Sequence, residues 1–400
     1  MSIFKKADIL LPKKDIDYEK WSVIACDQYT SQPEYWHRVE KNVGDAPSTL
    51  KIVYPEVYLS EGDKRIEAIN SQMDSYLESD IFTEYKNTLI FIERTQSDKR
   101  VREGIIGAVD LEAYDFSIGS QSLIRATEGT VLERIPPRVK IRQNAPLELP
   151  HIILLINDSE DTVIKKPQNA KKLYDFDLME NGGHLAGYQI PDTDADKILE
   201  KLDKMEKSAE GNLLFAVGDG NHSLATAKTC WENIKKTLSD EEIKTHPARY
   251  CLVEIENIHS AALDFEPIHR VVFDVSEKEI IDGIKRFYQG TNASGDGHHI
   301  HYISKSSEGD LYIKDSNCAL AVGSLQNYLD IMGFKVDYIH GEDAARELVN
   351  KGENIAFLLP KMDKSDLFKA VIKDGALPRK TFSMGEANDK RFYFEAKRIK

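Results

Sequence analysis

The chain is poor in cysteine, in long apolar runs and in net positive charge. Its 400 residues include 4 Cys, too few for a disulfide scaffold, and no two of them have the Cys-x₂-Cys spacing of a zinc site. The longest apolar runs, such as residues 152–156, are far shorter than the ~20 residues of a membrane span. The formal net charge of −14 disfavours general binding to nucleic acid, whose phosphates attract clustered cations.

What remains is a soluble protein of ordinary globular composition, with 41% hydrophobic and 30% charged residues. The first residues lack the apolar core of a signal peptide, so we expect a cytoplasmic protein without a membrane or nucleic-acid partner. At about 150 residues per domain, the length predicts roughly two or three packed units. The composition leaves the oligomeric state open. If the protein binds phosphates, it needs a local basic pocket against its overall negative charge.

Hydrophobic periodicity predicts helices and strands that are mixed without strict alternation, which favours an α+β fold with mixed sheets. We expect one α+β part over residues 1–265 and an additional α/β part over residues 266–400. The expected helices span residues 63–79, 194–209, 224–238, 324–332, 342–349 and 364–374. The expected strands span residues 87–93, 102–110, 151–156, 212–217, 250–256, 300–304, 310–314 and 356–359.

The most informative segment is the connection between the strand at 212–217 and the helix at 224–238. It reads Gly218, Asp219, Gly220, Asn221, His222 and Ser223. Glycine permits a tight turn with positive φ, and the start of a helix attracts anions through its N–H groups and dipole. Asp219 could hold a metal such as Mg²⁺, and His222 could exchange a proton. From the residues alone, a capped connection with a polar tip is the alternative.

A second stretch, Asp296-Gly297-His298-His299, has similar residues but a different context. It precedes an expected strand and no helix, so we do not predict a phosphate site there.

Cations are concentrated in residues 125–142, in contrast to the acidic chain as a whole. Beside an anion-binding loop they would attract negatively charged ligands, whereas the alternative is a solvated basic face. Further basic residues follow Pro267 and Pro378. The candidates for phosphate binding are Arg134, Arg138, Arg142, His269, Arg270 and Lys380.

Four segments resemble the bacterial and archaeal domain of unknown function 1015 family. Residues 215–227 resemble its "I-A-D-G-H-H-R-Y-x-x-A" signature, and residues 265–272 its "P-T-H-R-V-V". Residues 133–138 resemble its early "H-E-x-T-x-P/K-x-x-R", and residues 375–382 its closing "G-x-x-M-P-x-K-S-T-x-F". The segments occur in the family's order over nearly the whole chain, although Asn221 and Ser223 replace the first His and the Arg of the signature.

The signature is also similar to the phosphate loop of ParB/sulfiredoxin-like proteins, which include free-serine kinases. This resemblance implies a nucleotide-binding core in which residues 219–222 form the phosphate loop and His269, Arg270 and Lys380 form a second wall. Residues 23–29 resemble the family's "V-I-A-P-P-Y-D-V", which places Asp27 among the candidate bases, with Glu34 and Glu128 as the others.

The resulting hypothesis is a phosphate-handling enzyme that uses Mg²⁺ and ATP or ADP to phosphorylate a small hydroxyl metabolite such as free serine. Its partners would be a nucleotide or a small phosphorylated metabolite. Asp219 and His222 would be catalytic, with Asp27 or Glu128 as the base. Two alternatives remain: a phosphoserine-type phosphatase, and a non-catalytic ParB-like nucleotide-binding module.

Overall fold

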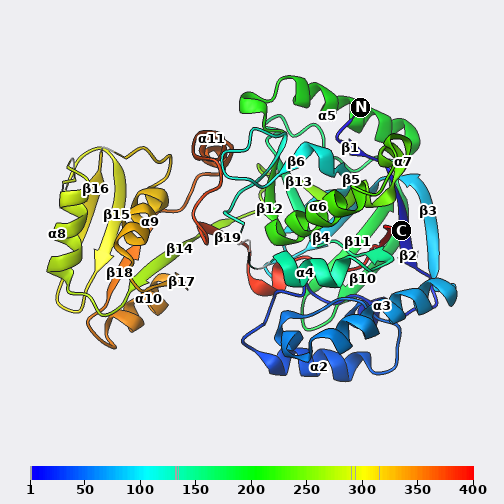
Figure 1. Cartoon of the computed structure of the whole chain (residues 1–400), viewed down its shortest axis with the longest axis horizontal. Helices are drawn as coiled ribbons and strands as arrows, with labels where there is room; N and C mark the ends of the chain where they lie inside the picture. Colours follow the sequence, from blue (N-terminus) through cyan, green and yellow to red (C-terminus); the bar gives the residue numbers. More distant parts are fainter. Residues whose placement is uncertain (1, 131–132, 134, 290, 293, 315) are drawn as a thin grey trace. The chain divides into compact units, whose positions relative to one another are not determined.

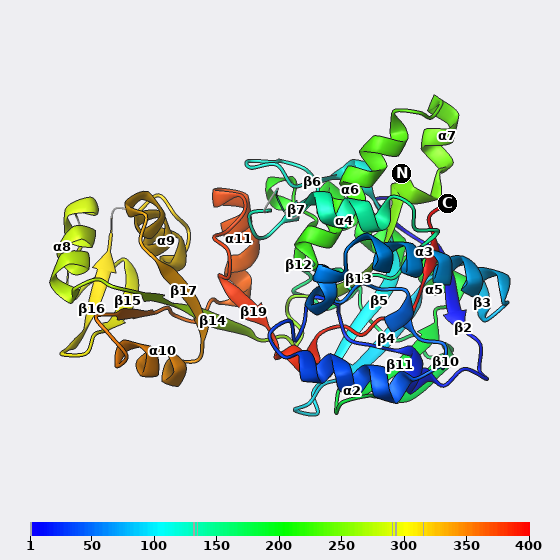
Figure 2. The same cartoon turned by 60° about the horizontal axis from the view of Figure 1, so that its bottom comes forward.

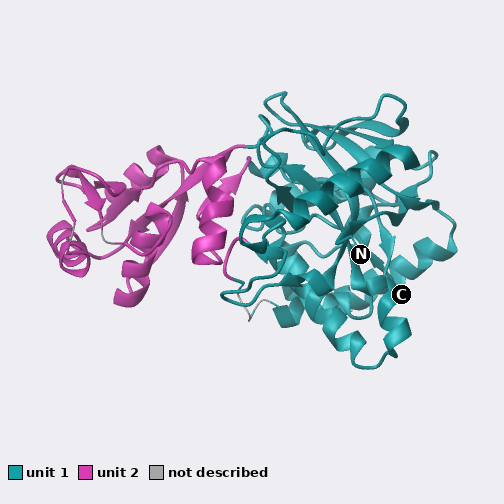
Figure 3. Ribbon diagram, turned by 90° about the horizontal axis from the view of Figure 1, so that it is seen from above, with its two compact units in different colours: residues 1–126, 130–263, 386–400 teal, residues 127–129, 264–385 magenta. Residues whose placement is uncertain are grey.

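The computed structural model describes residues 2–130, 133, 135–289, 291–292, 294–314 and 316–400. It divides into two compact units, which Figure 3 colours separately. Unit 1 comprises residues 1–126, 130–263 and 386–400, and unit 2 comprises residues 127–129 and 264–385. Both units combine helices with largely antiparallel sheets, so the chain is α+β, as the sequence predicts.

Unit 1 is built on a mixed sheet of ten strands among the described residues, in the order β10-β11-β4-β5-β13-β9-β12-β7-β6, with β1 beside β5. Two small pairs, β2–β3 and β8–β20, complete its strands. The bounds are β1 (Phe4–Lys5), β2 (Ala7–Pro12), β3 (Phe82–Thr88), β4 (Ile90–Thr95), β5 (Val101–Asp110), β6 (Tyr114–Asp115), β7 (Ile124–Ala126), β8 (Leu147–Glu148), β9 (Ile153–Ile156), β10 (Lys171–Leu178), β11 (Gly183–Gln189), β12 (Phe215–Asp219), β13 (Tyr250–Asn257) and β20 (Lys397–Arg398).

The helices of unit 1 cover this sheet and its connections (Figure 1). They are α1 (Tyr18–Trp21), α2 (Pro33–Val43), α3 (Asp63–Glu78), α4 (Ile135–Arg142), α5 (Asp192–Lys207), α6 (Asn221–Lys235) and α7 (Asp240–Thr245). The 3₁₀ turns are η1 (Thr49–Lys51), η2 (Glu56–Glu61), η3 (Leu111–Ala113), η5 (Glu210–Asn212), η6 (Pro247–Arg249) and η7 (Ala387–Asp389).

The apolar pattern of the sequence explains the core of unit 1. Ile69, Met73 and Tyr76 recur at helical spacing on α3 and are all buried. Strand β9 is apolar at every position and buried throughout, because β12 and β13 flank it on either side within the sheet. Strands β4 and β5 pair in antiparallel register from Ile90 opposite Ile106, as expected for a hairpin.

The C-terminal segment returns to unit 1, where it is drawn in red in Figure 2. Residues 266–400 were expected to form one part, but residues 386–400 pack elsewhere. Ala396 bridges Leu10, Phe392 bridges Ile24, and β20 pairs with β8. Phe392, Phe394 and Ala396 are fully or almost fully buried, so the segment is a component of the unit 1 core that the order along the chain does not indicate.

Unit 2 contains a sheet in the order β16-β15-β18-β14-β17, with β19 also paired to β14. All of these pairs are antiparallel. The strands are β14 (Phe265–Val272), β15 (His298–Ile303), β16 (Glu308–Ile313), β17 (Val336–His340), β18 (Ile355–Leu358) and β19 (Phe382–Met384). The helices are α8 (Glu277–Phe287), α9 (Ala321–Met332), α10 (Glu342–Val349) and α11 (Lys364–Asp374).

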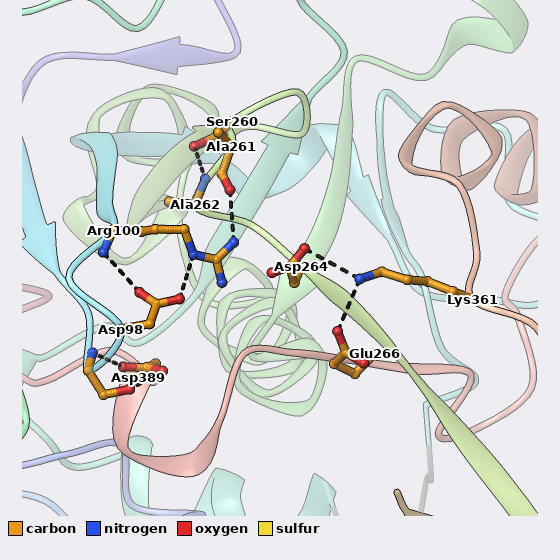
Figure 4. Close-up of polar contacts among 10 residues, drawn as sticks. Asp98, Arg100, Ser260, Ala261, Ala262, Asp264, Glu266, Lys361 and Asp389 are labelled. Atoms are coloured by element: carbon orange, nitrogen blue, oxygen red, sulfur yellow. Dashed lines mark hydrogen bonds and ion pairs between the residues drawn. The ribbon is translucent and has the colours of Figure 1, made fainter. Parts of the chain in front are cut away.

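Ion pairs hold the segments at which the chain leaves unit 1 and enters unit 2 (Figure 4). In unit 1, Arg100 pairs with Asp98 and donates to the carbonyl of Ala261. In unit 2, Lys361 pairs with Asp264 at 3.5 Å and with Glu266 at 3.1 Å. Each set fixes its segment within its own unit.

The predicted elements are found with shifts at their ends. The helix expected at 63–79 is α3, and the strand at 300–304 is β15, which begins at His298 and is followed by β16 and not by a helix. In the described part of the chain, no helix combines the length and apolar character needed to cross a membrane.

Candidate functional site

The predicted strand–turn–helix is present in unit 1. Strand β12 ends at Asp219, and α6 begins at Asn221, three residues earlier than expected. Between them, Gly220 has a φ of 80°, the left-handed conformation that glycine adopts without strain. A Cβ atom at this position would lie 3.0 Å from Cα of Ile152, so glycine is also required by the close approach of the chain before β9.

Asp219 is held by the turn and by a lysine. Its Oδ1 accepts the Gly220 N–H at 2.8 Å, and its Oδ2 lies 3.2 Å from Nζ of Lys390. Burial acts to raise the pKa of Asp219, but Lys390, His151 and the N–H bond outweigh it, so the pKa lies below its ordinary value. Asp219 is therefore an ionised partner of Lys390.

The surroundings of Asp219 do not fit a dedicated metal site. Its nearest charged partner is a lysine, whereas Mg²⁺ requires oxygen ligands. Within the residues that the structure describes, no group of three or more His, Cys, Asp or Glu is arranged to hold a metal ion.

A cavity of about 430 Å³ opens beside the first turns of α6, entirely within unit 1. Ser223 and Thr226 line it from α6, where their spacing of three residues puts both on one face. Most of the remaining wall is apolar, from residues such as Ile52, Met73 and Leu149. Its charged and polar lining residues, apart from the thiols of Cys26 and Cys251, are Tyr54, Glu56, Glu133, Arg138, Arg142, Glu148, His151, Ser223, Thr226 and Tyr393.

Two of the predicted cations line this cavity from α4. Arg138 pairs with Glu56, and Arg142 pairs with the buried Glu148. Both guanidinium groups are thus fixed by carboxylates before any ligand arrives. Arg134, the third predicted cation of this stretch, lies outside the described residues.

His151 connects the α6 loop to the C-terminal segment, a role that sequence reasoning missed. Its Nε2 lies 3.2 Å from Oγ of Ser223, and its Nδ1 lies 2.8 Å from the hydroxyl of Tyr393. The Tyr393 oxygen also accepts the N–H of Cys26 at 3.3 Å. The signal in the sequence was weak: His151 lies two residues before β9, the strand that pairs with β12.

The other predicted loop residues contact the protein differently. Gly218 lies within β12, and neither Asp219, Asn221 nor His222 is among the described residues that line the cavity. The carbonyl of His222 accepts the hydroxyl of Thr226 at 2.7 Å. The structure therefore brings Ser223, Arg138 and Arg142 together at one cavity.

The candidate bases of the N-terminal part do not line the cavity. Asp27 accepts a hydrogen bond from the side chain of Gln28 at 2.9 Å, next to Cys26, which does line the cavity. Glu34 lies in the exposed first turn of α2. Burial raises the pKa of the Cys26 thiol to about 12, so this thiol is protonated at neutral pH and a poor nucleophile.

The second-wall candidates His269, Arg270 and Lys380 belong to unit 2, as does the candidate base Glu128. Arg270 is fully buried and donates to the side chain of Gln326 and to the carbonyls of Ile268, Arg379 and Lys380.

Nδ1 of His269 accepts the Leu359 N–H, and Oε1 of Glu128 accepts the Lys380 N–H. Burial lowers the pKa of Arg270 to about 10. Its hydrogen bonds within unit 2 indicate a packing role for a cation that was predicted to bind ligand.

The carboxylate of Glu148 makes the stability of unit 1 sensitive to acid. Burial acts to raise the pKa of Glu148, but Lys397 and Arg142 outweigh it and the pKa is lowered. A lowered folded-state pKa stabilises the protein above the unfolded-state pKa, about 4.3, and this stabilisation is lost as the pH falls through the folded-state value. We expect urea unfolding to show a free energy that falls below about pH 4.3, and Glu148→Gln to flatten this dependence. An equally steep acid loss in Glu148→Gln would contradict the assignment.

The site thus belongs to an α+β protein with a ligand-sized cavity at a helix N-terminus. The family described as "Protein of unknown function (DUF1015)" matches residues 10–332, and the chain belongs to this family, which confirms the family resemblance. Three of the four sequence segments lie within the matched range, whereas residues 375–382 lie beyond it. No curated protein matches the chain.

Several solved structures are similar in part. A free serine kinase in complex with AMP has a TM-score of 0.38 at 11% identity, covering 70% of this chain and 91% of that chain. SbnI with a C-terminal truncation, from Staphylococcus aureus, has a TM-score of 0.38 at 9% identity, covering 70% and 82%. A conserved hypothetical protein from Pyrococcus furiosus has a TM-score of 0.35 at 10% identity, covering 72% and 95%. With TM-scores this low, these likenesses assign neither ligand nor activity to the chain.

Proposed function

We propose that the chain is a phosphate-handling enzyme that binds ATP or ADP in the unit 1 cavity and transfers a phosphoryl group to a small hydroxyl metabolite such as free serine. The observation that carries this proposal is the meeting of Ser223, in the first turn of α6, with the guanidinium of Arg138 at one cavity. A helix N-terminus and a guanidinium both favour a phosphate group.

The dimensions and lining of the cavity support a nucleotide-sized ligand. Its volume of about 430 Å³ lies within the ~300–1,000 Å³ of typical ligand sites. The apolar wall around Ile52 and Leu149 would receive a base, and the polar end with Arg138 and Ser223 would receive the phosphates. The ligand would compete with Glu56 for the Arg138 guanidinium, since the two already form an ion pair.

The remaining predicted residues have supporting parts in this proposal. Asp219, through Lys390 and the Gly220 N–H, would hold the turn that presents Ser223. Asn221 and His222 would contribute backbone groups of the first helical turn. Asp27 is retained as a candidate proton acceptor because its neighbour Cys26 lines the cavity.

The proposal is tested by incubating the purified chain with serine and ATP or ADP in a buffer containing Mg²⁺ and analysing the products by mass spectrometry. Formation of phosphoserine supports it. Phosphate release from phosphoserine without nucleotide would indicate the phosphatase alternative. A nucleotide-dependent rise in melting temperature without product would indicate a binding module. The absence of both phosphoserine and a shift in melting temperature would refute the proposal.

Arg138 provides a sharper test of the binding site. We expect Arg138→Met to weaken nucleotide binding by about 10- to 100-fold, because a hydrogen bond to a charged group contributes ~1.5–3 kcal/mol. The matched control is Lys140→Met on the same helix, whose ammonium pairs with Asp63 and does not line the cavity. Isothermal titration calorimetry measures both. Equal effects of the two substitutions would show that only overall charge matters.

A further inference from the structure

Three side chains form a continuous hydrogen-bonded chain at the polar end of the cavity. Ser223 Oγ lies 3.2 Å from His151 Nε2, and His151 Nδ1 lies 2.8 Å from the Tyr393 hydroxyl. All three residues line the cavity, although His151 itself is only 7% exposed. A hydroxyl next to an imidazole whose second nitrogen is oriented by another group is the arrangement of an activated nucleophile.

Each member is fixed by a different part of the fold. Ser223 follows the left-handed turn at Gly220, which directs the start of α6 toward the cavity. His151 lies directly before Ile152, whose main chain approaches that glycine closely. Tyr393 belongs to the buried C-terminal segment. Its ring packs edge to face against the imidazole of His151, with 5.6 Å between the ring centroids. The hydrogen-bonded chain of Ser223, His151 and Tyr393 is therefore held by packing and does not depend on flexible surface side chains.

We propose that Ser223 is the nucleophile of the site, that it carries the phosphoryl group as a covalent intermediate, and that His151 is its base. This inference rests on the phosphoryl transfer proposed above. In the required tautomer, Nδ1–H donates to the Tyr393 oxygen and Nε2 presents its lone pair to Ser223. Burial raises the pKa of Tyr393, so the phenol remains neutral and acts as a positioning group.

The two half-reactions balance without any further reactant. In the first, Oγ of Ser223 bonds to the terminal phosphorus of the nucleotide, the bond to the leaving nucleotide oxygen breaks, and the Oγ proton moves to Nε2 of His151. The shortened nucleotide departs and His151 releases this proton to water. In the second, the acceptor hydroxyl bonds to phosphorus and gives its proton to His151, while the bond to Oγ breaks and Ser223 regains a proton from His151.

The surroundings favour a phosphate on Ser223. A phosphoserine in the first turn of a helix is stabilised by the positive end of the helix dipole. Arg138 and Arg142 line the same cavity, and the phosphate oxygens would share their guanidinium groups with Glu56 and Glu148.

The test is to incubate the full chain with ATP or ADP, without acceptor, and to map phosphorylated peptides by mass spectrometry. We expect phosphate on Ser223 and exchange of labelled ADP into ATP, or of labelled AMP into ADP. Ser223→Ala is expected to lose the adduct, the exchange and about 10³-fold or more of transfer, the scale of removing a nucleophile. The matched control is Thr229→Ala on the same helix, whose hydroxyl donates to the carbonyl of Ala225 away from the cavity.

Failure of the inference and failure of the proposed function have different signatures. Phosphoserine production by folded Ser223→Ala at the normal rate would overturn the intermediate and leave the kinase intact. Absence of any transfer by the unaltered chain would overturn both. Thermal unfolding of each variant shows whether it is folded.

Tyr393→Phe tests the positioning role. We expect a loss of about tenfold in kcat with an unchanged KM for nucleotide, because one hydrogen bond orients the base and does not touch the ligand. A rise in KM with unchanged kcat would show that Tyr393 shapes the cavity instead.

Discussion

Arg391→Leu is expected to lower the free energy of unfolding of unit 1 by about 3–5 kcal/mol, the cost of leaving a buried charge without its partner. Nε of Arg391 lies 2.8 Å from Glu254 and one terminal nitrogen lies 2.6 Å from Glu395, while the other donates to the carbonyl of Pro150. Both carboxylates are 1% exposed or less. Leucine would remove a guanidinium that two buried acids share, leaving Glu254 with the charge of Arg102.

The same residue anchors the C-terminal segment to the sheet. Glu254 lies on β13, whereas Arg391 and Glu395 lie in the returning segment, so the ion pair joins residues 137 positions apart. Loss of this ion pair is expected to loosen the packing of Tyr393 next to His151 as well. The three Trp of the chain, Trp21, Trp36 and Trp231, are fully buried in unit 1, so urea unfolding followed by tryptophan fluorescence reports on this unit.

The control is an exposed ion pair of the same unit. Lys197 and Asp194 pair at 3.0 Å on α5, with the lysine side chain 69% exposed. Lys197→Ala is expected to change the unfolding free energy by less than about 1 kcal/mol. If Arg391→Leu were equally mild, the network would contribute specificity without net stability.

Gly220→Val is expected to destabilise unit 1 by at least ~1–3 kcal/mol and to abolish the proposed nucleotide binding. A β-branched residue at a φ of 80° is strained, and its Cβ would lie 3.0 Å from two atoms of Ile152. Relief of that contact requires the turn or the chain before β9 to move. Either movement separates Ser223 from His151.

A second glycine separates the effect of backbone strain from the effect of the contact with Ile152. Gly119 has a φ of 77°, but a Cβ there would meet nothing within 4 Å. Gly119→Val should therefore show the cost of strain alone and leave nucleotide binding intact. Fluorescence-detected unfolding and calorimetric titration of both variants provide the comparison. Equal binding by the two would show that the Gly220 turn does not position the site.

Local sequence patterns were sufficient for elements with a clear apolar period or apolar run, but not for the short strands and the polar helices. The spacing of Ile69, Met73 and Tyr76 marks α3, and the apolar run at 152–156 marks β9. Helix α4 was missed because it has Pro136 and Pro137 in its first turn and shows no clear apolar period over its eight residues. The return of residues 386–400 to unit 1 was missed because the sequence of a short segment does not indicate which distant strand it pairs with.

The site was predictable only in part, for a similar reason. The turn from Gly218 to Ser223 follows from glycine conformation and helix capping, which are local. Cations near the turn were expected from composition. Arg138 and Arg142 do line the cavity, whereas the guanidinium of Arg270 forms hydrogen bonds within unit 2. Sequence alone does not distinguish a cation that faces a cavity from one that binds backbone carbonyls.

The sequence by itself determined the α+β class, the family and the position of the strand–turn–helix, because these depend on residues close together along the chain. The tertiary structure alone decided that His151, 72 residues before Ser223, and Tyr393, 242 residues after His151, meet at this turn. Hydrogen bonds between such distant residues depend on the register of β9 beside β12 and on the path of the C-terminal segment. The energy that fixes both comes from burial of the whole core, which no single segment contains.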